Sequence, residues 1–491
     1  MHSFLFWAAA ALLPLVQGAG VTGSATGSAY GVTGGGDATP VTPTTTDELL
    51  TYLTDSTPRV ILITKEFDFT GSMGTATETG CIPSSNTCGS AGQNAINAAN
   101  NWCGDSPSVQ VTYDKAGITG ISVASNKSIV GVGSNAVIKG RGLRLQGVSN
   151  VIIQNVHLTD LNPQYIWGGD LITLVGTDMI WIDHCKFSLT GRQMIVTGYE
   201  AAGRVTISNN EFDGATSWSA SCNGHHYWTM LFLGAEDYIT LVNNYIHTVS
   251  GRAPKVGGSG SIFMHAVNNY FYDVAGHDFD VAKGGNVLIE GNYFDNVTYP
   301  ITSQTASDGG YLFNMASGSA STCSSAMGQT CQANTLIDSG AFADYKSTSL
   351  LATIAKKEAD SPIVPMAAAD VPKYVLANAG VGKLSASGST SASSKASSVV
   401  ASKTSSVASS SVAPSSVASS SVASSKVSSK TAAKVASTTV LSSSSVSKTA
   451  SPTTLQTVSK VASSTTSAAP LTTGPAEVTG DDSEDDTCDA E

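Results

Sequence analysis

The 491-residue sequence predicts an all-β solenoid, because an irregular repeat runs between residues 126 and 297. Each repeat is a short alternating strand, then Asn or a small residue, then another apolar or aromatic position. Gly-rich and polar turns separate the repeats, and no long helical periodicity interrupts them. The unequal spacings favour a parallel β-helix whose loops vary in length. The segments are VIIQNVHL, IWIDHCKF, VTISNNEF, ITLVNNYI, FMHAVNNYF and VLIEGNYF.

Superposing the segments aligns one column of polar or small residues. We expect Asn side chains stacked in this column to hydrogen-bond along the coils, although ordinary turn formation would also explain them. Strand alternation places Ile182, His184 and Ile207 on one face, so His184 is predicted to be an interior histidine and not a base or ligand. The column consists of Asn155, His184, Asn209, Asn243, Asn268 and Gly291.

Composition divides the chain into segments. Residues 1–18 contain a short apolar run that is typical of a secretory signal peptide and too short for a transmembrane helix. Residues 19–384 carry the repeats. Residues 385–475 are rich in Ser, Ala, Thr and Val, which indicates a disordered, O-glycosylated stalk, and residues 476–491 form a solvated acidic tail. We expect a secreted, extracellular monomer with no membrane partner, whose stalk could associate with a cell wall.

The charge balance restricts the partners. With 25 basic and 37 acidic residues the net charge is −12, which argues against a nucleic-acid partner. An anionic polymer would be repelled at long range unless the site were locally positive or the charges of the polymer were masked.

Cysteine usage agrees with secretion, since six of the eight cysteines lie in polar, Gly-rich or Ser-rich stretches suited to disulfides. Their spacing alone leaves the pairing open. Cys185 lies in an apolar strand and is predicted to be a small core residue, whereas Cys488 in the tail is a candidate for intermolecular pairing or for a free thiol. Asn126 and Asn296 begin glycosylation sequons.

The segment SGRAPK, from Ser250 to Lys255, places two cations on a turn that Pro254 stiffens. Arg252 and Lys255 could hold an anion there. A surface loop with two solvated charges is the alternative from these residues alone.

Five segments, taken in order along the chain, carry a family resemblance. Over residues 19–384 the chain resembles fungal pectin lyases, which belong to the pectate lyase superfamily of right-handed parallel β-helices. The resemblance implies a side cleft formed by the variable loops, a polysaccharide substrate, and cleavage of methyl-esterified galacturonan. The segments are WGGDLITL, WIDHCKFS, GHHYW, GRAPKV and NNYFYDVAGHDFDV.

The resemblance also implies roles for individual residues. Arg252 matches the proposed base, Lys255 and Arg192 match further cations of the cleft, and Asp170 matches an acidic group beside them. Aromatic residues that would line the cleft are Trp102, Trp167, Tyr227 and Trp228. The implied disulfides are Cys81–Cys103, Cys88–Cys222 and Cys323–Cys331.

The chemistry of β-elimination suits these residues. A base removes the C5 proton of a galacturonate ester while the C4 oxygen departs, and cations stabilise the enolate that develops. Arginine normally stays charged, but neighbouring cations and exclusion of water would disfavour the charged form of Arg252. An esterified substrate needs no Ca²⁺ to cancel its charge, and Arg192 stands where calcium-dependent pectate lyases have a carboxylate. We therefore expect an endo-acting pectin lyase with no metal and no cofactor.

Other functions remain open at this point. A calcium-dependent pectate lyase would act on de-esterified galacturonan. A polygalacturonase would need convergent carboxylates and a GHG turn, for which the GHD at Gly276 is a poor substitute, so His277 is predicted to be structural. A noncatalytic polysaccharide-binding wall protein would use the solenoid for binding only. The loop from Cys81 to Cys88 lacks the aromatic that members of the family often have.

Overall fold

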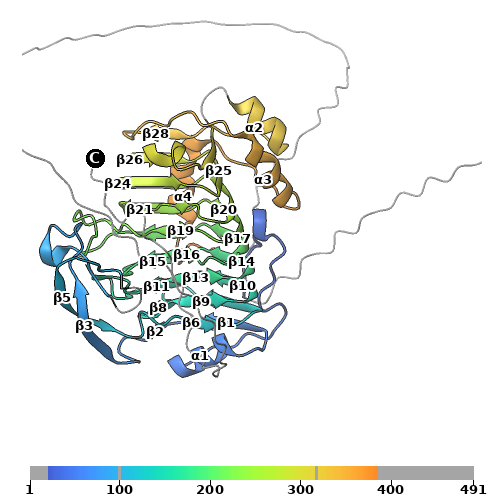
Figure 1. The fold of residues 1–491 in the computed structure, drawn as a ribbon. Coiled ribbons are helices and arrows are strands. Elements are labelled where there is room, and N and C mark those ends of the chain that lie inside the picture. The colour runs from blue at the N-terminus through green and yellow to red at the C-terminus, as the bar shows by residue number, and fades with distance from the viewer. Residues whose placement is uncertain (1–19, 98–100, 316–318, 385–491) are drawn as a thin grey trace, which may run out of the picture. The chain divides into compact units, whose positions relative to one another are not determined.

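The computed structural model describes residues 20–97, 101–315 and 319–384. The predicted signal peptide, stalk, acidic tail and Cys488 lie outside the described residues. The described chain is a parallel β-helix, as the repeats predict (Figure 1). Within the described ranges, no helix is long and apolar enough to cross a membrane.

One face of the coil stack is a nine-stranded parallel sheet. The six superposed segments supply six consecutive strands of this sheet, from β10 to β25, which confirms the repeat. In order across the sheet, the strands are β1 (Arg59–Ile63), β7 (Lys127–Gly131), β10 (Ser149–Gln154), β14 (Asp178–Asp183), β17 (Gly203–Ser208), β20 (Glu236–Val242), β23 (Ser261–Val267), β25 (Gly285–Glu290) and β27 (Tyr311–Asn314).

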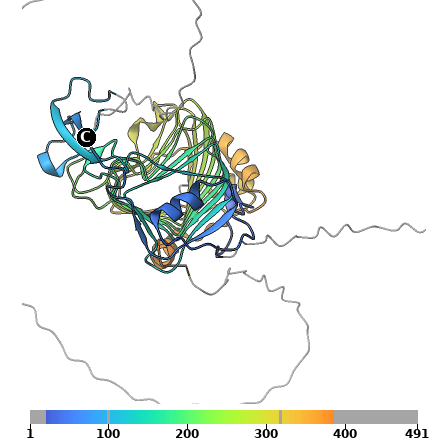
Figure 2. The same cartoon turned by 90° about the horizontal axis from the view of Figure 1, so that it is seen from below.

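The other faces belong to a 15-stranded sheet whose two halves are joined by the long strand β24. Figure 2 shows the coils from one end, with strands on several sides of a common interior. In order, the strands are β2 (Glu66–Asp68), β8 (Val137–Lys139), β11 (His157–Thr159), β15 (Lys186–Ser188), β18 (Glu211–Asp213), β21 (Tyr245–Val249), β24 (Tyr270–Val281), β22 (Lys255–Val256), β19 (Met230–Phe232), β16 (Ile195–Thr197), β13 (Ile172–Val175), β9 (Leu143–Gln146) and β6 (Ile121–Val123), with β26 (Tyr293–Ile301) beside β24 and β28 (Thr335–Ile337) beside β26.

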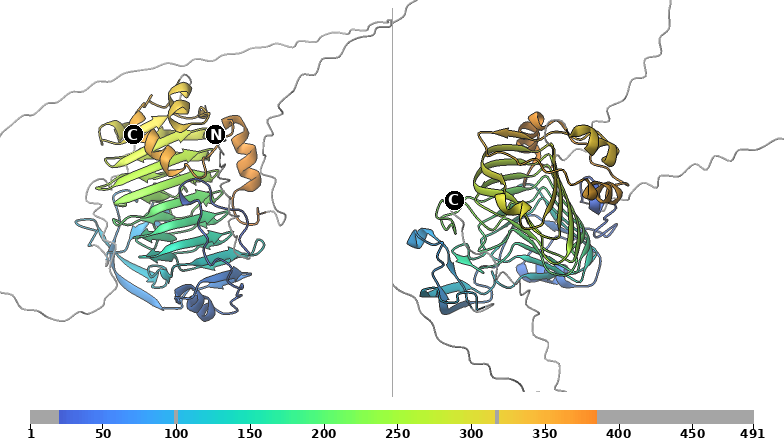
Figure 3. Two further views of the ribbon diagram at one scale, coloured as in Figure 1. Left: turned by 90° about the vertical axis from the view of Figure 1, so that its right-hand side faces the viewer. Right: turned by 45° about the horizontal axis from the view of Figure 1, so that its top comes forward.

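A four-stranded sheet and short helices complete the fold. The sheet consists of β12 (Tyr165–Ile166), β4 (Asn94–Ala95), β3 (Thr75–Cys81) and β5 (Ser108–Asp114). Helix α1 (Thr46–Thr54) buries Leu49 and Leu53 against the first coils. The later helices pack outside the stack (Figure 3). They are α2 (Ala320–Met327), α3 (Leu351–Lys357) and α4 (Val371–Asn378), and the 3₁₀ turns are η1 (Gly27–Ala29), η2 (Gly89–Ala91), η3 (Ser303–Ala306), η4 (Thr348–Leu350) and η5 (Ala368–Asp370).

The core consists of rows of aliphatic side chains that point inward at equal register in successive coils. Ile182 pairs with Ile207, and Ile207 with Leu241, and all three are fully buried. Each buried aliphatic side chain stabilises the fold by about 1.5–3 kcal/mol relative to an exposed one. Cys185 is also fully buried and is a free thiol, and burial raises its pKa to about 12, which confirms it as an inert core residue.

In four of the six superposed coils, the Asn ladder lies one residue later than the sequence predicted. Residues of the superposed column have positive φ and form the corner itself, as at Asn209 with φ 52°. Asn and Gly tolerate this left-handed conformation. The following residues point inward and stack, since each side-chain amide donates to the Asn Oδ1 of the next coil. The ladder consists of Asn210, Asn244, Asn269, Asn292 and Asn334, joined at 2.9–3.1 Å.

The same corner corrects the position of His184. Ile182 is buried in the core as predicted, but His184 has φ 50° and its side chain is 14% exposed. Its Nδ1 lies 2.6 Å from Asp183 Oδ2. Strand alternation ends at residue 183, so His184 is a corner residue and not an interior one.

Candidate active site

The predicted charged residues gather at one edge of neighbouring parallel strands. Strands β13, β16, β19, β22 and β24 are consecutive in the 15-stranded sheet. Neighbouring strands lie about 4.8 Å apart, so residues at their beginnings form a continuous row. Asp170 precedes β13, Arg192 precedes β16, Arg252 precedes β22, and Lys255 begins β22.

Arg192 contacts both Asp170 and an aromatic ring. Nη1 of Arg192 is 4.0 Å from Oδ2 of Asp170, and the guanidinium lies 3.8 Å from the ring centroid of Trp167. The other Asp170 oxygen, Oδ1, accepts the N–H of Gln193 at 2.7 Å. Because Arg192 is only 7% exposed, the ion pair and the cation–π contact hold a fixed positive charge at the edge of the sheet.

Arg252 is buried to a similar degree, with 3% exposure. Its guanidinium carbon lies 4.7 Å from the ring centroid of Trp228 and 5.9 Å from that of Tyr227. The backbone of Arg252 donates its N–H to His277 Nε2 at 3.2 Å and accepts the N–H of Met230 at 2.7 Å. The turn around Pro254 is therefore an ordered part of the sheet edge and not a solvated surface loop.

Lys255 lies one strand away from a second carboxylate. It pairs in register with Asp280 of β24, and its Nζ is 3.4 Å from Asp280 Oδ2. Its side chain is 26% exposed, so it is the most accessible of the three cations. The edge thus combines two guanidinium groups and one ammonium group with two carboxylates, which leaves a positive local balance in an acidic chain.

The four predicted aromatic residues belong to one cluster. Trp228 is 5% exposed and its indole N–H donates to Gln93 Oε1 at 2.9 Å, so its ring is fixed in the cluster. The three other aromatics, Trp102, Trp167 and Tyr227, are partly buried. The Cys81–Cys103 disulfide packs into the same cluster and joins β3 to the segment that carries Trp102.

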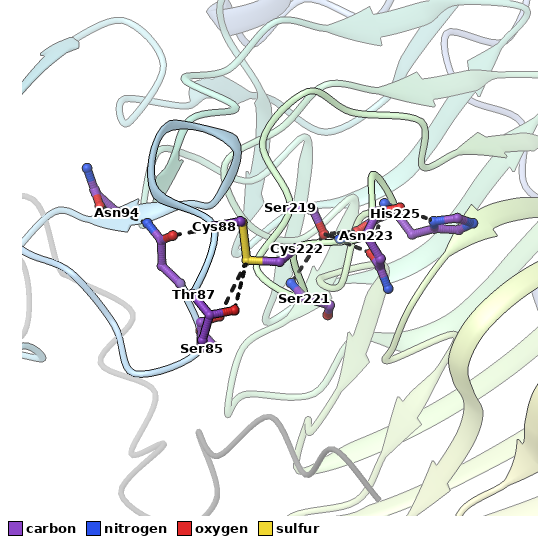
Figure 4. The surroundings of a disulfide bond; sticks show 10 residues. Ser85, Thr87, Cys88, Asn94, Ser219, Ser221, Cys222, Asn223 and His225 are labelled. Carbon is purple, nitrogen blue, oxygen red and sulfur yellow. Dashed lines mark hydrogen bonds between the residues drawn. A yellow bond between two sulfur atoms is a disulfide. The ribbon is translucent and has the colours of Figure 1, made fainter. Parts of the chain in front are cut away.

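Two further disulfides have the pairs that the resemblance implies, Cys88–Cys222 and Cys323–Cys331. Figure 4 shows Cys88–Cys222 joining two loops beside Ser219 and Ser221. The Ser221 hydroxyl is 3.0 Å from the hydroxyl of Ser250, the first residue of the turn that carries Arg252. The disulfide therefore anchors a loop that contacts this turn.

His226 joins two segments of the candidate site, a role that the sequence did not reveal. Its Nε2 donates to the carbonyl oxygens of Arg192, at 2.8 Å, and Trp228, at 3.0 Å. Burial lowers its pKa to about 4, so the imidazole is neutral and holds two segments of the cleft together. Its position directly before Tyr227, in the GHHYW segment, is the feature of the sequence that could have indicated this role.

The two sequons differ in their surroundings. Asn126 is half-buried and its Oδ1 accepts from Asn150 Nδ2 at 2.8 Å. Asn296 is exposed and its Nδ2 donates to Asp273 Oδ1 at 3.0 Å.

The donor set at the edge does not fit a calcium ion, which needs several converging oxygen ligands. In the part of the chain that the structure describes, two groups of three His, Cys, Asp or Glu residues lie close enough to hold a metal, and neither includes Asp170. The charged group beside Asp170 is a guanidinium, which repels a metal cation.

Comparisons with known proteins place the chain in a family. The pectate lyase family model matches residues 1–384. Probable pectin lyase F of Emericella nidulans is 56% identical over 391 residues, which cover 79% of this chain and 82% of the relative. Probable pectin lyase F-2 of Aspergillus terreus is 54% identical over 388 residues, which cover 79% of each. A solved pectate lyase from Bacillus sp. N165, in complex with trigalacturonate, has a TM-score of 0.46 and 20% identity, covering 73% of this chain and 99% of that chain. This chain belongs to the pectate lyase family.

Proposed function

We propose that the protein is a secreted, monomeric pectin lyase that cleaves methyl-esterified galacturonan internally by β-elimination. The observation that carries the proposal is the contact between Arg192 and Asp170. A calcium site would need a second carboxylate beside Asp170, and the group found there is a guanidinium. The pectin lyase names of relatives more than 50% identical support the same substrate.

In the proposed reaction, Arg252 in its neutral form takes the proton from C5 of the uronate ester. The electron pair forms the C4–C5 double bond as the C4–O bond breaks, and the departing oxygen takes a proton from solvent. Negative charge develops on the ester carbonyl oxygen, where Lys255 and Arg192 supply fixed positive charge. Arg252 is 3% exposed and its guanidinium lies against Tyr227 and Trp228, which keep water away from it.

The partly buried aromatics Trp102, Trp167 and Tyr227 offer apolar faces to the sugar rings of an uncharged polymer. An ester-capped polymer also lacks the negative charge that the acidic chain would repel. Both features favour esterified over de-esterified galacturonan.

The test measures near-ultraviolet absorbance of the unsaturated product during incubation with highly methylated pectin and, separately, with polygalacturonate. We expect absorbance to rise rapidly with methylated pectin and at least about 10-fold more slowly with polygalacturonate. A 10-fold difference in rate corresponds to about 1.4 kcal/mol in activation free energy. No absorbance on either polymer would overturn the lyase function, and a faster rate on polygalacturonate would overturn the substrate.

A further inference from the structure

Strand β24 approaches the turn that carries Arg252 unusually closely. A Cβ atom on Gly276 would lie 1.9 Å from the carbonyl oxygen of Ser250, so only glycine allows this approach. The N–H of His277 then points to the same carbonyl at 3.4 Å. The Gly-His pair of the GHD segment thus brings an imidazole beneath the Arg252 turn.

In this position the His277 ring accepts a backbone hydrogen bond. Its Nε2 accepts the backbone N–H of Arg252 at 3.2 Å, which requires the ring proton to be on Nδ1. Burial lowers the pKa of His277 to about 4, assisted by Arg252 and Lys255 and opposed by Asp280. The edge of the Tyr227 ring packs on the imidazole, with centroids 5.8 Å apart. The neutral acceptor form is therefore maintained at neutral pH.

The backbone of Arg252 needs such support because it has a φ of 47°. A residue with a Cβ in this left-handed region persists only when its surroundings fix it. Two backbone hydrogen bonds fix it here, one from the N–H to His277 and one from Met230 to the carbonyl oxygen. The direction of the Arg252 side chain depends on both.

We propose that His277 is a positioning residue for Arg252, acting by accepting its backbone N–H from beneath the turn. The proposal rests on the catalytic role of Arg252 proposed above. A purely structural role for His277 would predict a loss of stability when the residue is replaced. The positioning role instead predicts a loss of turnover without a matching loss of substrate binding or stability.

The kinetic test compares His277→Met, which removes the acceptor, with His277→Gln, whose Oε1 can replace Nε2. We expect kcat on methylated pectin to fall about 10- to 100-fold in His277→Met with KM within about twofold, and to recover most of that loss in His277→Gln. His157→Met is the matched control, since His157 is a half-buried histidine whose pKa is likewise lowered to about 4 by burial, and it is hydrogen-bonded to Ser188 away from this edge. It should leave kcat unchanged.

Amide hydrogen exchange gives a readout that does not depend on activity. In His277→Met the peptide containing residues 250–255 should lose protection at the Arg252 amide by on the order of 10-fold, with protection regained in His277→Gln. Unchanged protection in His277→Met, or equal kcat values for the Met and Gln variants, would overturn the positioning role. An inactive wild-type protein with the expected exchange pattern would overturn the proposed function but leave the contact established.

Discussion

Two regions of the molecule bury charge, and they do so differently. On the outer face of the nine-stranded sheet, His265 lies between two carboxylates, with Nδ1 2.9 Å from Glu358 and Nε2 2.9 Å from Glu290. All three residues are at most 3% exposed, and Thr240 donates its hydroxyl to Glu358 at 2.6 Å. At the sheet edge of the candidate active site, by contrast, aromatic rings lie against two buried cations, Arg192 and Arg252.

The difference indicates what each cluster is for. The His265 cluster is satisfied within the fold, and it ties the segment after α3 to strands β23 and β25. At the sheet edge, Arg192, Arg252 and Lys255 lie with aromatic rings and with the carboxylates of Asp170 and Asp280. Fixed cations in such a place can stabilise the negative charge that develops in the proposed transition state. Mutations in the cleft should therefore change turnover, and mutations in the scaffold should change stability.

The largest expected effect is the loss of turnover in Arg252→Lys. A lysine keeps the charge but not the geometry of the guanidinium beside the Tyr227 and Trp228 rings. We therefore expect kcat to fall about 1,000-fold, or roughly 4 kcal/mol in activation free energy. Thermal unfolding should be nearly unchanged. Arg204→Lys, on the exposed face of the nine-stranded sheet, is the control. Near-normal turnover in Arg252→Lys would remove Arg252 from the base role.

The next effect concerns the Cys88–Cys222 disulfide, which anchors a loop that contacts the turn carrying Arg252. Replacing Cys88 and Cys222 by Ser opens a bridge across a sequence separation of 134, and we expect the free energy of unfolding to fall by about 4 kcal/mol. KM should also rise, because the loop contacting Ser250 loosens. The Cys323–Cys331 bridge spans a separation of only 8 and is the control, with a smaller stability loss and unchanged KM. Equal losses for the two pairs would contradict this account.

Mutations in the Asn ladder should lower stability and leave turnover unchanged, the opposite of what we expect for Arg252. Asn269→Ala removes a side chain that donates to Asn292 and accepts from Asn244, leaving buried partners unsatisfied. We expect a loss of roughly 3 kcal/mol in urea unfolding and an unchanged kcat for the folded protein. Asn378→Ala, outside the ladder, should cost much less. A reduced kcat at full stability would place the ladder in the function.

The last effect, and the smallest when taken over a single pH unit, is a pH dependence of stability. Burial opposes charge on His265, but the two carboxylates outweigh it and raise its pKa to about 10. Because the folded value lies above the unfolded value of about 6.5, the stabilisation is complete below pH 6.5 and is lost as pH rises to about 10. The stability difference between wild type and His265→Gln should shrink over this window by at most about 1.4 kcal/mol per pH unit. A constant difference across the window would show that His265 is not charged.

The sequence predicted the β-helix better than the residues that hold the candidate active site in place. Period-two alternation identified Ile182 and Ile207 as core residues, and the resemblance supplied Arg252 and Arg192. The ladder was placed one residue early, because alternation cannot reveal the left-handed corner at Asn209. His226 was missed, and His277 was predicted to be structural without its contact to Arg252, for a similar reason. Their contacts join residues 25 to 34 positions apart, which only the register of the coils brings together.

In the proposed active site, fixed cations take the place of a metal ion. The most direct test is the initial rate of product formation from highly methylated pectin, measured in excess chelator and again with added Ca²⁺. Because Arg192 stands beside Asp170 where a metal ligand would be needed, we predict equal rates under the two conditions. A rate that disappears with chelator and returns with Ca²⁺ would contradict the claim.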